Sequence, residues 1–407
     1  MGTPAEVDLH DVVAARDVIA GVVEHTPVLP SNTLSSVGRE VVLKAENLQR
    51  TGAFKIRGAM NKVASLGNDA RRGVTTGSAG NHAQALAFAA QHFGIPCEIC
   101  VPVGAPITKI EACESYGATV TEVGQSLGET VAAARRRADE CDMTFCAPFD
   151  DAAVVAGQGT LGLELVDDLP DLACVVVPLG GGGLASGVAI AVKTQLPHVQ
   201  VIGVQAEVCA PYRGLDVPVG AVLTLADGIA VKHPGEITGP LVDHWVDDIV
   251  AIDEDSIADA MVMLMERAKL YVEGAGAVGV AALMSGAIVQ PTTGATCVVI
   301  SGGNVDLGVV PGLIRRHEHQ AGRRLAVFSR IDDRPGALAS LLEVFAAGGA
   351  DLIEVEHIRE GLDLHVRETG LSATFAVRSA AHGRALVGAA REAGFDLHEL
   401  ATRTEPR

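Results

Sequence analysis

Short, nearly continuous runs of Val, Ile and Leu alternate with helical stretches along the chain between about residues 70 and 310. The apolar runs predict strands at residues 98–102, 174–179, 199–206 and 295–303. Between such runs, residues 81–92 and 255–269 have apolar positions at helical spacing. Strands that are apolar on both faces are typical of a parallel sheet covered by helices on both sides. The pattern therefore predicts an α/β fold, with ligands bound at the carboxyl ends of its strands.

The pattern changes at the charged and polar stretch of residues 315–324, which we interpret as a linker. Strands are then predicted at residues 325–331, 351–359, 371–379 and 395–402, and helices at residues 337–349 and 380–394. This β-α-β-β-α-β order is that of a ferredoxin-like domain. We expect a domain of residues 1–316, a linker of residues 317–323 and a second domain of residues 324–407.

Composition and charge limit the function. The chain has 407 residues and a formal net charge of −19, which argues against binding to nucleic acid or to an anionic membrane. The first residues have no basic stretch followed by an apolar run, and no apolar run is long enough to span a bilayer. We therefore expect a cytoplasmic protein that acts on a small molecule, with neither a membrane nor a nucleic-acid partner.

The cysteines do not suggest a disulfide framework, because eight in a chain of this length are too sparse. Cys97 and Cys100 form a C-x-x-C inside a predicted strand, where residues three apart point to opposite faces. No second Cys or His pair at metal-ligand spacing accompanies them. We expect buried thiols and no bound metal.

Two segments in the first hundred residues could react with or bind a small molecule. Lys55 is flanked by Phe54 and Ile56, and an apolar setting favours the neutral amine that a Schiff-base lysine needs. The alternative is a surface lysine whose stem covers apolar neighbours. Residues 78–82, Ser-Ala-Gly-Asn-His, precede an Ala-rich helix, where backbone N–H groups can bind a carboxylate. The alternative there is a plain helix N-cap.

Four consecutive glycines, Gly180 to Gly183, lie between a predicted strand and a predicted helix. Without Cβ atoms, the backbone amides of such a loop can converge on a phosphate. Gly180, Gly182 and Ala185 also satisfy G-x-G-x-x-A, with Glu207 at the end of the next strand. A dinucleotide site therefore remains open at this point.

Ser301 and Glu273 are two further candidates, in the second half of the chain. Ser301 would project from the carboxyl end of the strand at residues 295–303, although it could equally be an ordinary turn residue. Glu273 precedes a helix of small residues. That position favours a carboxylate facing the helix dipole over a group near a cofactor.

In this order, the segments at residues 49–59, 75–90, 178–187 and 299–306 resemble the fold-type II pyridoxal-phosphate enzymes, specifically the threonine dehydratases (threonine ammonia-lyases). The similarity runs from about residue 10 to residue 315, and residues 332–359 resemble part of an ACT domain. The resemblance implies two open-sheet α/β subdomains, the smaller one of roughly residues 50–150 being inserted in the larger. A C-terminal ferredoxin-like ACT domain, with a regulatory role, would follow them.

The resemblance implies pyridoxal 5′-phosphate as the cofactor and Lys55 as the catalytic residue, in a Schiff base with the cofactor. The other cofactor-binding residues would be Phe54 beside the ring, Asn81 at the 3′-oxygen, Ser301 at the pyridine nitrogen, and Gly180, Gly181, Gly182, Gly183 and Leu184 around the phosphate. The substrate carboxylate would be bound by Ser78, Ala79, Gly80, Asn81 and His82.

The implied reaction removes water and then ammonia from L-threonine, in a homo-oligomer (dimer or tetramer). Because its product, 2-oxobutanoate, feeds isoleucine biosynthesis, isoleucine or valine is the expected allosteric effector of the ACT domain; a purely oligomerising domain is the alternative. A serine or 3-hydroxyaspartate dehydratase also remains open, since one methyl group in a pocket is worth only about 1–3 kcal/mol. A nicotinamide-dependent oxidoreductase and a non-catalytic amino-acid sensor are more distant alternatives.

Two positions depart from the family pattern. Ala53 stands where many relatives have Ser before the Phe-Lys pair, which removes one hydrogen-bonding group but leaves the Schiff base intact. Ala79 stands where related serine racemases carry a hydroxyl residue that acts as a base on the opposite face of the cofactor. We therefore expect elimination rather than racemisation. The carboxylate metal ligands of those racemases have no clear match near residues 205–212.

Overall fold

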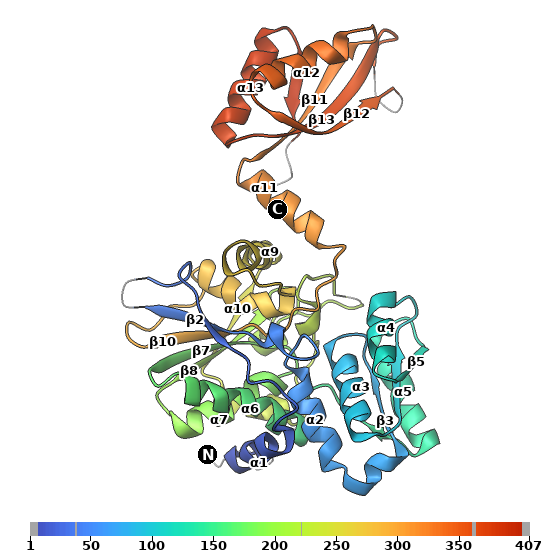
Figure 1. Cartoon of the computed structure of the whole chain (residues 1–407), viewed down its shortest axis with the longest axis vertical. Coiled ribbons are helices and arrows are strands. Elements are labelled where there is room, and N and C mark those ends of the chain that lie inside the picture. The colour runs from blue at the N-terminus through green and yellow to red at the C-terminus, as the bar shows by residue number, and fades with distance from the viewer. Residues whose placement is uncertain (1–6, 37–38, 221, 360–363, 401–407) are drawn as a thin grey trace. The chain divides into compact units, whose positions relative to one another are not determined.

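The computed structural model describes residues 7–36, 39–220, 222–359 and 364–400. The chain forms two compact units, residues 1–306 and residues 307–407. The first unit contains one mostly parallel and one fully parallel sheet, and the second contains one antiparallel sheet (Figure 1).

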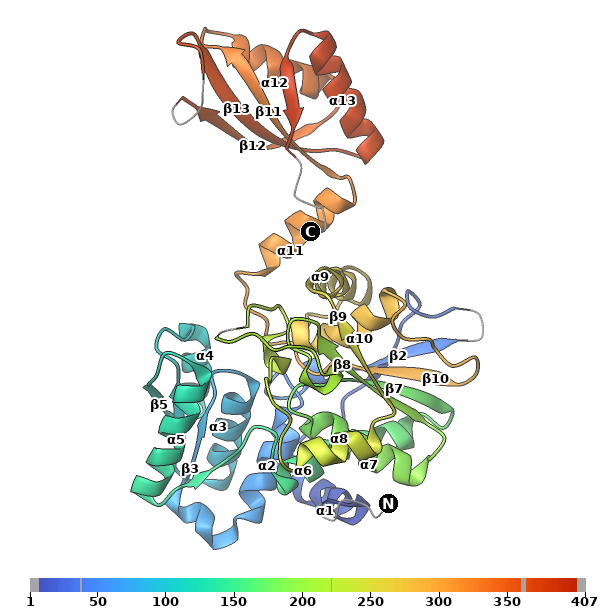
Figure 2. The same cartoon turned by 180° about the vertical axis from the view of Figure 1, so that it is seen from behind.

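The larger sheet of the first unit has six strands in the order β1-β2-β10-β7-β8-β9, and only β1 is antiparallel to its neighbour. Its strands are β1 (Val28–Pro30), β2 (Glu40–Lys44), β7 (Leu172–Pro178), β8 (Gln200–Ala206), β9 (Asp248–Ile252) and β10 (Ala295–Val299). Its helices are α1 (Leu9–Ile19), α6 (Ala152–Asp168), α7 (Gly183–Gln195), α8 (Thr238–Trp245), α9 (Glu254–Met263) and α10 (Gly274–Met284), with a π-helical turn at Leu264–Ala268. Helices α9 and α10 cover one face, and the other four lie on the opposite face (Figures 1 and 2). The continuous apolar runs of β7 and β10 are therefore buried on both sides, as predicted.

The smaller sheet lies between β2 and β7 in the sequence, which makes it an inserted subdomain. Its four strands are all parallel, in the order β5-β4-β3-β6. They are β3 (Val74–Gly77), β4 (Cys97–Val101), β5 (Thr119–Glu122) and β6 (Thr144–Phe145), and the helices of this region are α2 (Lys55–Ser65), α3 (Asn81–Phe93), α4 (Ile107–Ser115) and α5 (Leu127–Cys141). Helix α2 packs against both α3 and α6 and so connects the two subdomains.

The second unit begins with α11 (Val310–Gln320) and continues in the predicted β-α-β-β-α-β order. Its elements are β11 (Arg324–Asp332), α12 (Ala337–Ala347), β12 (Asp351–Ile358), β13 (Glu368–Ala376), α13 (Ala380–Glu392) and β14 (Asp396–Glu399). The antiparallel sheet has the order β12-β13-β11-β14. Phe345 and Phe375 stack with ring centroids 4.1 Å apart in a core that this unit builds alone. The ferredoxin-like topology is confirmed. The predicted domain boundary at residue 316 falls inside α11. The charged and polar residues of this helix resemble those of a linker, which is why the boundary was misplaced.

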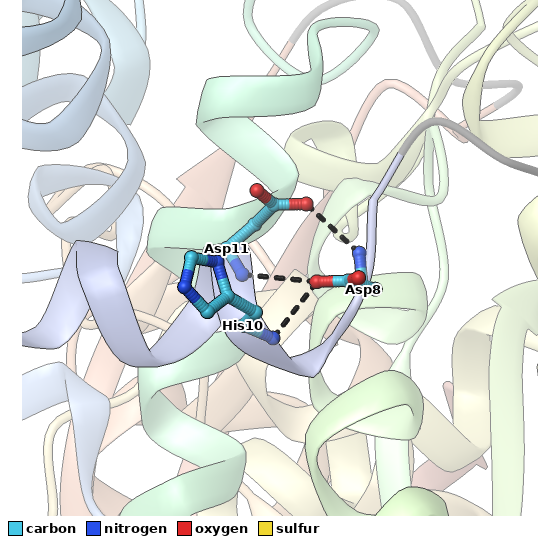
Figure 3. A group of neighbouring side chains, drawn as sticks. All are labelled: Asp8, His10 and Asp11. Carbon is cyan, nitrogen blue, oxygen red and sulfur yellow. Dashed lines mark hydrogen bonds between the residues drawn. The ribbon is translucent and has the colours of Figure 1, made fainter.

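Helix α1 begins with a capping box formed by the side chains of Asp8 and Asp11 (Figure 3). An oxygen of the Asp8 carboxylate accepts from the N–H groups of His10 (2.8 Å) and Asp11 (3.1 Å), and Asp11 accepts from the N–H of Asp8 at 3.0 Å. These three exposed residues also have metal-ligand spacing, but the capping bonds account for their arrangement. No helix within the described residues is long and apolar enough to cross a membrane.

Candidate active site

The glycine loop follows β7 in the middle of the larger sheet. Gly182 has a φ of +95°, and α7 begins at Gly183, so the loop turns directly into the start of a helix. A Cβ atom on Gly181 would overlap the ring of Phe149, and one on Gly182 would lie 2.8 Å from the hydroxyl of Tyr212. Only glycine fits these positions. The first backbone N–H groups of α7 have no partner within the helix, so this loop is suited to bind an anion.

Two hydroxyl groups hold the outer side of this loop. Thr238 Oγ1 donates to the carbonyl oxygen of Gly181 at 2.5 Å, and the hydroxyl of Tyr212 donates to the same oxygen at 3.4 Å. Asp150 accepts from the backbone N–H groups of residues 236–238 at 2.9–3.0 Å, which fixes the segment that carries Thr238. These residues were missed by sequence reasoning, because no motif connects residues 150, 212 and 238 to the loop.

Lys55 is the first residue of α2, and its side chain is only partly exposed. Its amine donates a hydrogen bond to the carbonyl oxygen of Pro148 at 2.9 Å, one residue before the phenylalanine that packs on the glycine loop. Burial lowers the pKa of Lys55 to about 8, although Glu273 opposes the shift. Most of the amine is still protonated near physiological pH, but its neutral fraction is far larger than that of an ordinary lysine. The surface-lysine alternative is wrong.

Ser301 follows β10, the strand beside β7, and lies next to the residues that precede Lys55. Its carbonyl oxygen accepts from the N–H of Phe54 at 3.1 Å, and Ala53 forms an antiparallel bridge with Gly302. Ser301 is 2% exposed. The carboxyl ends of β7 and β10 thus lie side by side at one edge of the sheet, as expected for parallel strands.

The loop of residues 78–82 follows β3 of the smaller sheet. Gly80 is the N-cap of α3, without a side-chain capping bond, and Ser78 Oγ accepts from the N–H of Gly80 at 3.3 Å. No side chain caps α3 there, and the binding of a carboxylate by this segment stays a prediction. His82 Nε2 lies 3.1 Å from the carbonyl oxygen of Cys146, so Nε2 carries the hydrogen and Nδ1 is an acceptor. Nδ1 has no partner among the described residues. Burial and the nearby Lys55 lower the pKa of His82 to about 3, which keeps its ring neutral.

Glu273 occupies the N-cap position of α10, but its side chain makes no capping bond. Its Oε1 instead accepts from Asn81 Nδ2 at 2.7 Å, and Asn304 Nδ2 donates to Asn81 Oδ1 at 2.9 Å. Burial, with a contribution from Asp227, raises the pKa of Glu273 to about 7 against the opposing effect of Asn81 and two lysines. The carboxylate thus lies at the start of α10, as the helix-dipole interpretation expects, but it bonds to the side chain of Asn81, and a place near a cofactor stays a prediction.

The cysteine pair of β4 shows no sign of chemistry. Cys97 and Cys100 are free and buried, and burial raises the pKa of both thiols above the ordinary value. A protonated, buried thiol is a poor nucleophile and a poor metal ligand.

The site therefore joins a partly neutral amine, an anion-binding glycine loop and a second helix start at the edges of two parallel sheets. A family model described as "Pyridoxal-phosphate dependent enzyme" matches residues 19–302, and the chain belongs to this family. The dinucleotide interpretation of Gly180, Gly182 and Ala185 finds no support.

Individual proteins of this family are similar to the chain over most of its length. The chain is 46% identical to the L-threonine ammonia-lyase of Thermotoga maritima over 367 residues, 88% of this chain and 91% of that protein. It is 41% identical to the L-threonine ammonia-lyase of Geobacter sulfurreducens over 388 residues, 94% of this chain and 96% of that protein. Among solved structures, maize serine racemase superposes with a TM-score of 0.71 at 34% identity, covering 77% of this chain and 99% of that one.

The residues of the site fit pyridoxal phosphate. The Lys55 amine suits an aldehyde, the Cβ-free loop at the start of α7 suits a phosphate, and the buried Ser301 offers a neutral hydroxyl. When bound, the cofactor supplies an aldehyde that captures amines and a conjugated ring that accepts electrons from the substrate.

Proposed function

We propose that this chain is an L-threonine ammonia-lyase, which converts L-threonine to 2-oxobutanoate and ammonia. Water is lost from the substrate and regained on hydrolysis, so the overall reaction balances. The proposal rests mainly on Lys55. Burial makes its amine partly neutral, and it lies beside the segment that packs on the glycine loop. The 46% identity to an L-threonine ammonia-lyase over nearly the whole chain supports threonine as the substrate.

The proposed roles follow from the chemistry of each side chain. Lys55 would hold the cofactor through its aldehyde, and its amine would take the α-proton of the substrate. The amides of residues 180–184 would hold the phosphate, Phe54 would pack beside the ring, and Ser301 would offer its hydroxyl to the pyridine nitrogen. Because a hydroxyl favours an unprotonated ring nitrogen more than a carboxylate does, Ser301 would limit electron withdrawal by the ring, which favours loss of the β-hydroxyl.

Residues 78–82 are proposed to bind the substrate carboxylate. The backbone N–H groups at the start of α3 attract an anion, and Ser78 and Asn81 add polar groups at the same end of the helix. His82 is neutral, so it contributes a hydrogen-bonding ring rather than a charge. Asn81 has a second role, donating to the 3′-oxygen of the cofactor.

The test is an oxo-acid assay with L-threonine, L-serine and 3-hydroxyaspartate as substrates. We expect the highest kcat/KM for threonine and no turnover by the Lys55→Ala variant. Lys62→Ala is the matched control, because Lys62 lies two turns further along α2 in an ion pair with Asp151. A higher kcat/KM for serine or 3-hydroxyaspartate would show that threonine is not the preferred substrate. Unchanged turnover by Lys55→Ala would refute the role of Lys55.

Racemisation is a second activity to measure, because the chain superposes on a serine racemase. Ala79 lies in the proposed carboxylate loop and has no hydroxyl to move a proton on the opposite face of the cofactor. We propose that elimination dominates. Chiral chromatography of incubations with L-serine should show oxo-acid and no accumulating D-serine; rapid D-serine formation would contradict this.

We also propose that the second unit is an ACT domain that binds isoleucine or valine and regulates the enzyme. The enzyme would then act in isoleucine biosynthesis. A cavity of about 320 Å³ in this unit is lined by Ile331, Asp333, Arg334, Leu338, His357 and Arg359, among others. It combines apolar side chains with two ion pairs, Arg334–Asp332 and Arg359–Asp333, whose charges suit the ammonium and carboxylate groups of an aliphatic amino acid. Isoleucine titrated against activity should change the threonine saturation curve, and Arg334→Ala should weaken that response. No change in rate or saturation would exclude isoleucine.

A further inference from the structure

Asn304 follows β10 and uses both amide hydrogens inside the site. Its Nδ2 donates to the carbonyl oxygen of Thr51 at 2.8 Å and to Asn81 Oδ1 at 2.9 Å. A backbone carbonyl can only accept a hydrogen bond. The contact with Thr51 therefore sets the orientation of the Asn304 amide, with Nδ2 facing Thr51.

The orientation of Asn304 determines the orientation of Asn81. Because Asn81 Oδ1 accepts from Asn304, its Nδ2 must face the opposite way, where it donates to Glu273 Oε1 at 2.7 Å. This bond uses one of the two hydrogens on Asn81 Nδ2 and leaves the other free. Glu273 alone could not fix the amide, because a protonated carboxyl group can donate as well as accept.

Asn304 is itself held in place by Gly52. The backbone of Gly52 has a φ of +73°, and a Cβ atom there would lie 2.5 Å from Asn304 Oδ1. The amide therefore lies directly against a glycine that tolerates no side chain. Such close packing leaves the Asn304 amide little room to turn over.

We propose that Asn304 is a positioning residue, which holds Asn81 with its free N–H directed at the 3′-oxygen of the cofactor. The proposal rests on the proposed function, since that function gives Asn81 its contact with the cofactor. A donor at this oxygen stabilises negative charge there. Asn304 should thus change the affinity and the absorption spectrum of the bound cofactor without touching it.

The experiment uses the Asn304→Asp and Asn304→Ser holoenzymes. In the Asp variant, a carboxylate would face the two oxygen acceptors of Thr51 and Asn81. The Ser variant removes both amide N–H donors without adding a charge. It keeps the test decisive if the Asp variant does not fold. Asn61→Asp is the matched control, because Asn61 is buried on α2 and donates to the carbonyl oxygen of Ala153 at 2.7 Å. Pyridoxal phosphate is titrated into each apoprotein, and the cofactor absorption is followed against pH.

Both Asn304 variants should bind the cofactor about tenfold more weakly, the size expected for one buried hydrogen bond. The pH midpoint of the absorption change should move upward, because the charged oxygen loses a donor. Asn61→Asp should keep both values. In an Asn81→Ala background, the Asn304 substitutions should have no further effect, as a residue acting only through Asn81 requires.

Wild-type affinity and absorption in both Asn304 variants would overturn the proposal, and so would an equal loss in the Asn81→Ala background. Borohydride reduction separates this failure from that of the proposed function. Cofactor fixed to Lys55 in the Asn304 variants leaves the proposed function standing, whereas an unlabelled Lys55 in the wild-type protein refutes the proposed function itself.

Discussion

Arg57 donates two hydrogen bonds to Glu46, from Nε and from Nη2, each at 2.8 Å. Both side chains are buried, at 1% and 0% exposed. Arg57 Nη1 also donates to Glu164 of α6 at 2.7 Å. Burial alone would raise the pKa of Glu46, but Arg57, with Thr26 and Lys44, lowers it below its ordinary value. Since Arg57 comes two residues after Lys55, this ion pair anchors the start of α2 and thereby the reactive amine.

The Arg57→Met variant should lose about 3–5 kcal/mol of unfolding free energy, because it leaves a buried carboxylate without its partner. Urea unfolding followed by tryptophan fluorescence reports the first unit, since the single tryptophan of the chain is Trp245 in α8. Arg50→Met is the control: the Arg50–Glu24 pair is 45% and 52% exposed, and its loss should cost less than about 1 kcal/mol. Equal effects of the two substitutions would contradict the anchoring role.

Glu273 should make the stability of the apoprotein fall as the pH rises from about 4.5 to about 7. Its folded pKa of about 7 lies above the ordinary 4.5, so the folded state keeps a proton that the unfolded chain has released. The stabilisation is complete below pH 4.5 and is lost as the pH passes 7. Glu273→Gln cannot titrate, and relative to the wild type it should gain up to about 3 kcal/mol between pH 4.5 and pH 8. A pH-independent difference in unfolding free energy would show that the carboxyl group has its ordinary pKa.

Gly181→Ala should weaken cofactor binding at least about tenfold, because the new Cβ atom would overlap the ring of Phe149 and displace the loop. Equilibrium titration of the apoprotein with pyridoxal phosphate measures the change. Gly128→Ala in α5 is the control, since a Cβ atom there meets nothing within 4 Å. If Gly181→Ala bound the cofactor as the wild type does, residues 180–183 would not be the phosphate site.

Cys141 should be the only cysteine that a thiol reagent modifies rapidly in the folded protein. It is exposed, whereas the other seven cysteines are buried. Ellman titration of the native protein should give one fast equivalent, which Cys141→Ser removes. More than one fast equivalent would show that the strand thiols, Cys97 and Cys100 among them, are accessible.

The sequence predicted those features that depend on local patterns. The apolar runs of β7 and β10 and the order of elements in the second unit are visible in the chain, because periodicity and turn residues are local. Residues 180–183 were also found, since four glycines at a strand end have few structural explanations. The family match then placed the chain in the class that the ordered motifs had suggested.

Features that depend on contacts between distant segments could not be predicted. Glu273 was assigned to a helix dipole because its contact with Asn81 spans 192 residues. Asn304 was not singled out, although it stands in the same glycine segment as Ser301. The hydroxyl group of Thr238 on the glycine loop depends on tertiary packing alone. The second half of helix α11 was taken for a linker, since its charged and polar residues are typical of both.

The measurement that tests the central claim most directly is borohydride reduction of the purified protein, followed by mass spectrometry of its peptides. The reduced cofactor should be found on Lys55, with Lys62→Ala labelled as fully as the wild type and Lys55→Ala unlabelled. Cofactor attached to another lysine, or Lys55 recovered unmodified from the wild-type protein, would contradict the account.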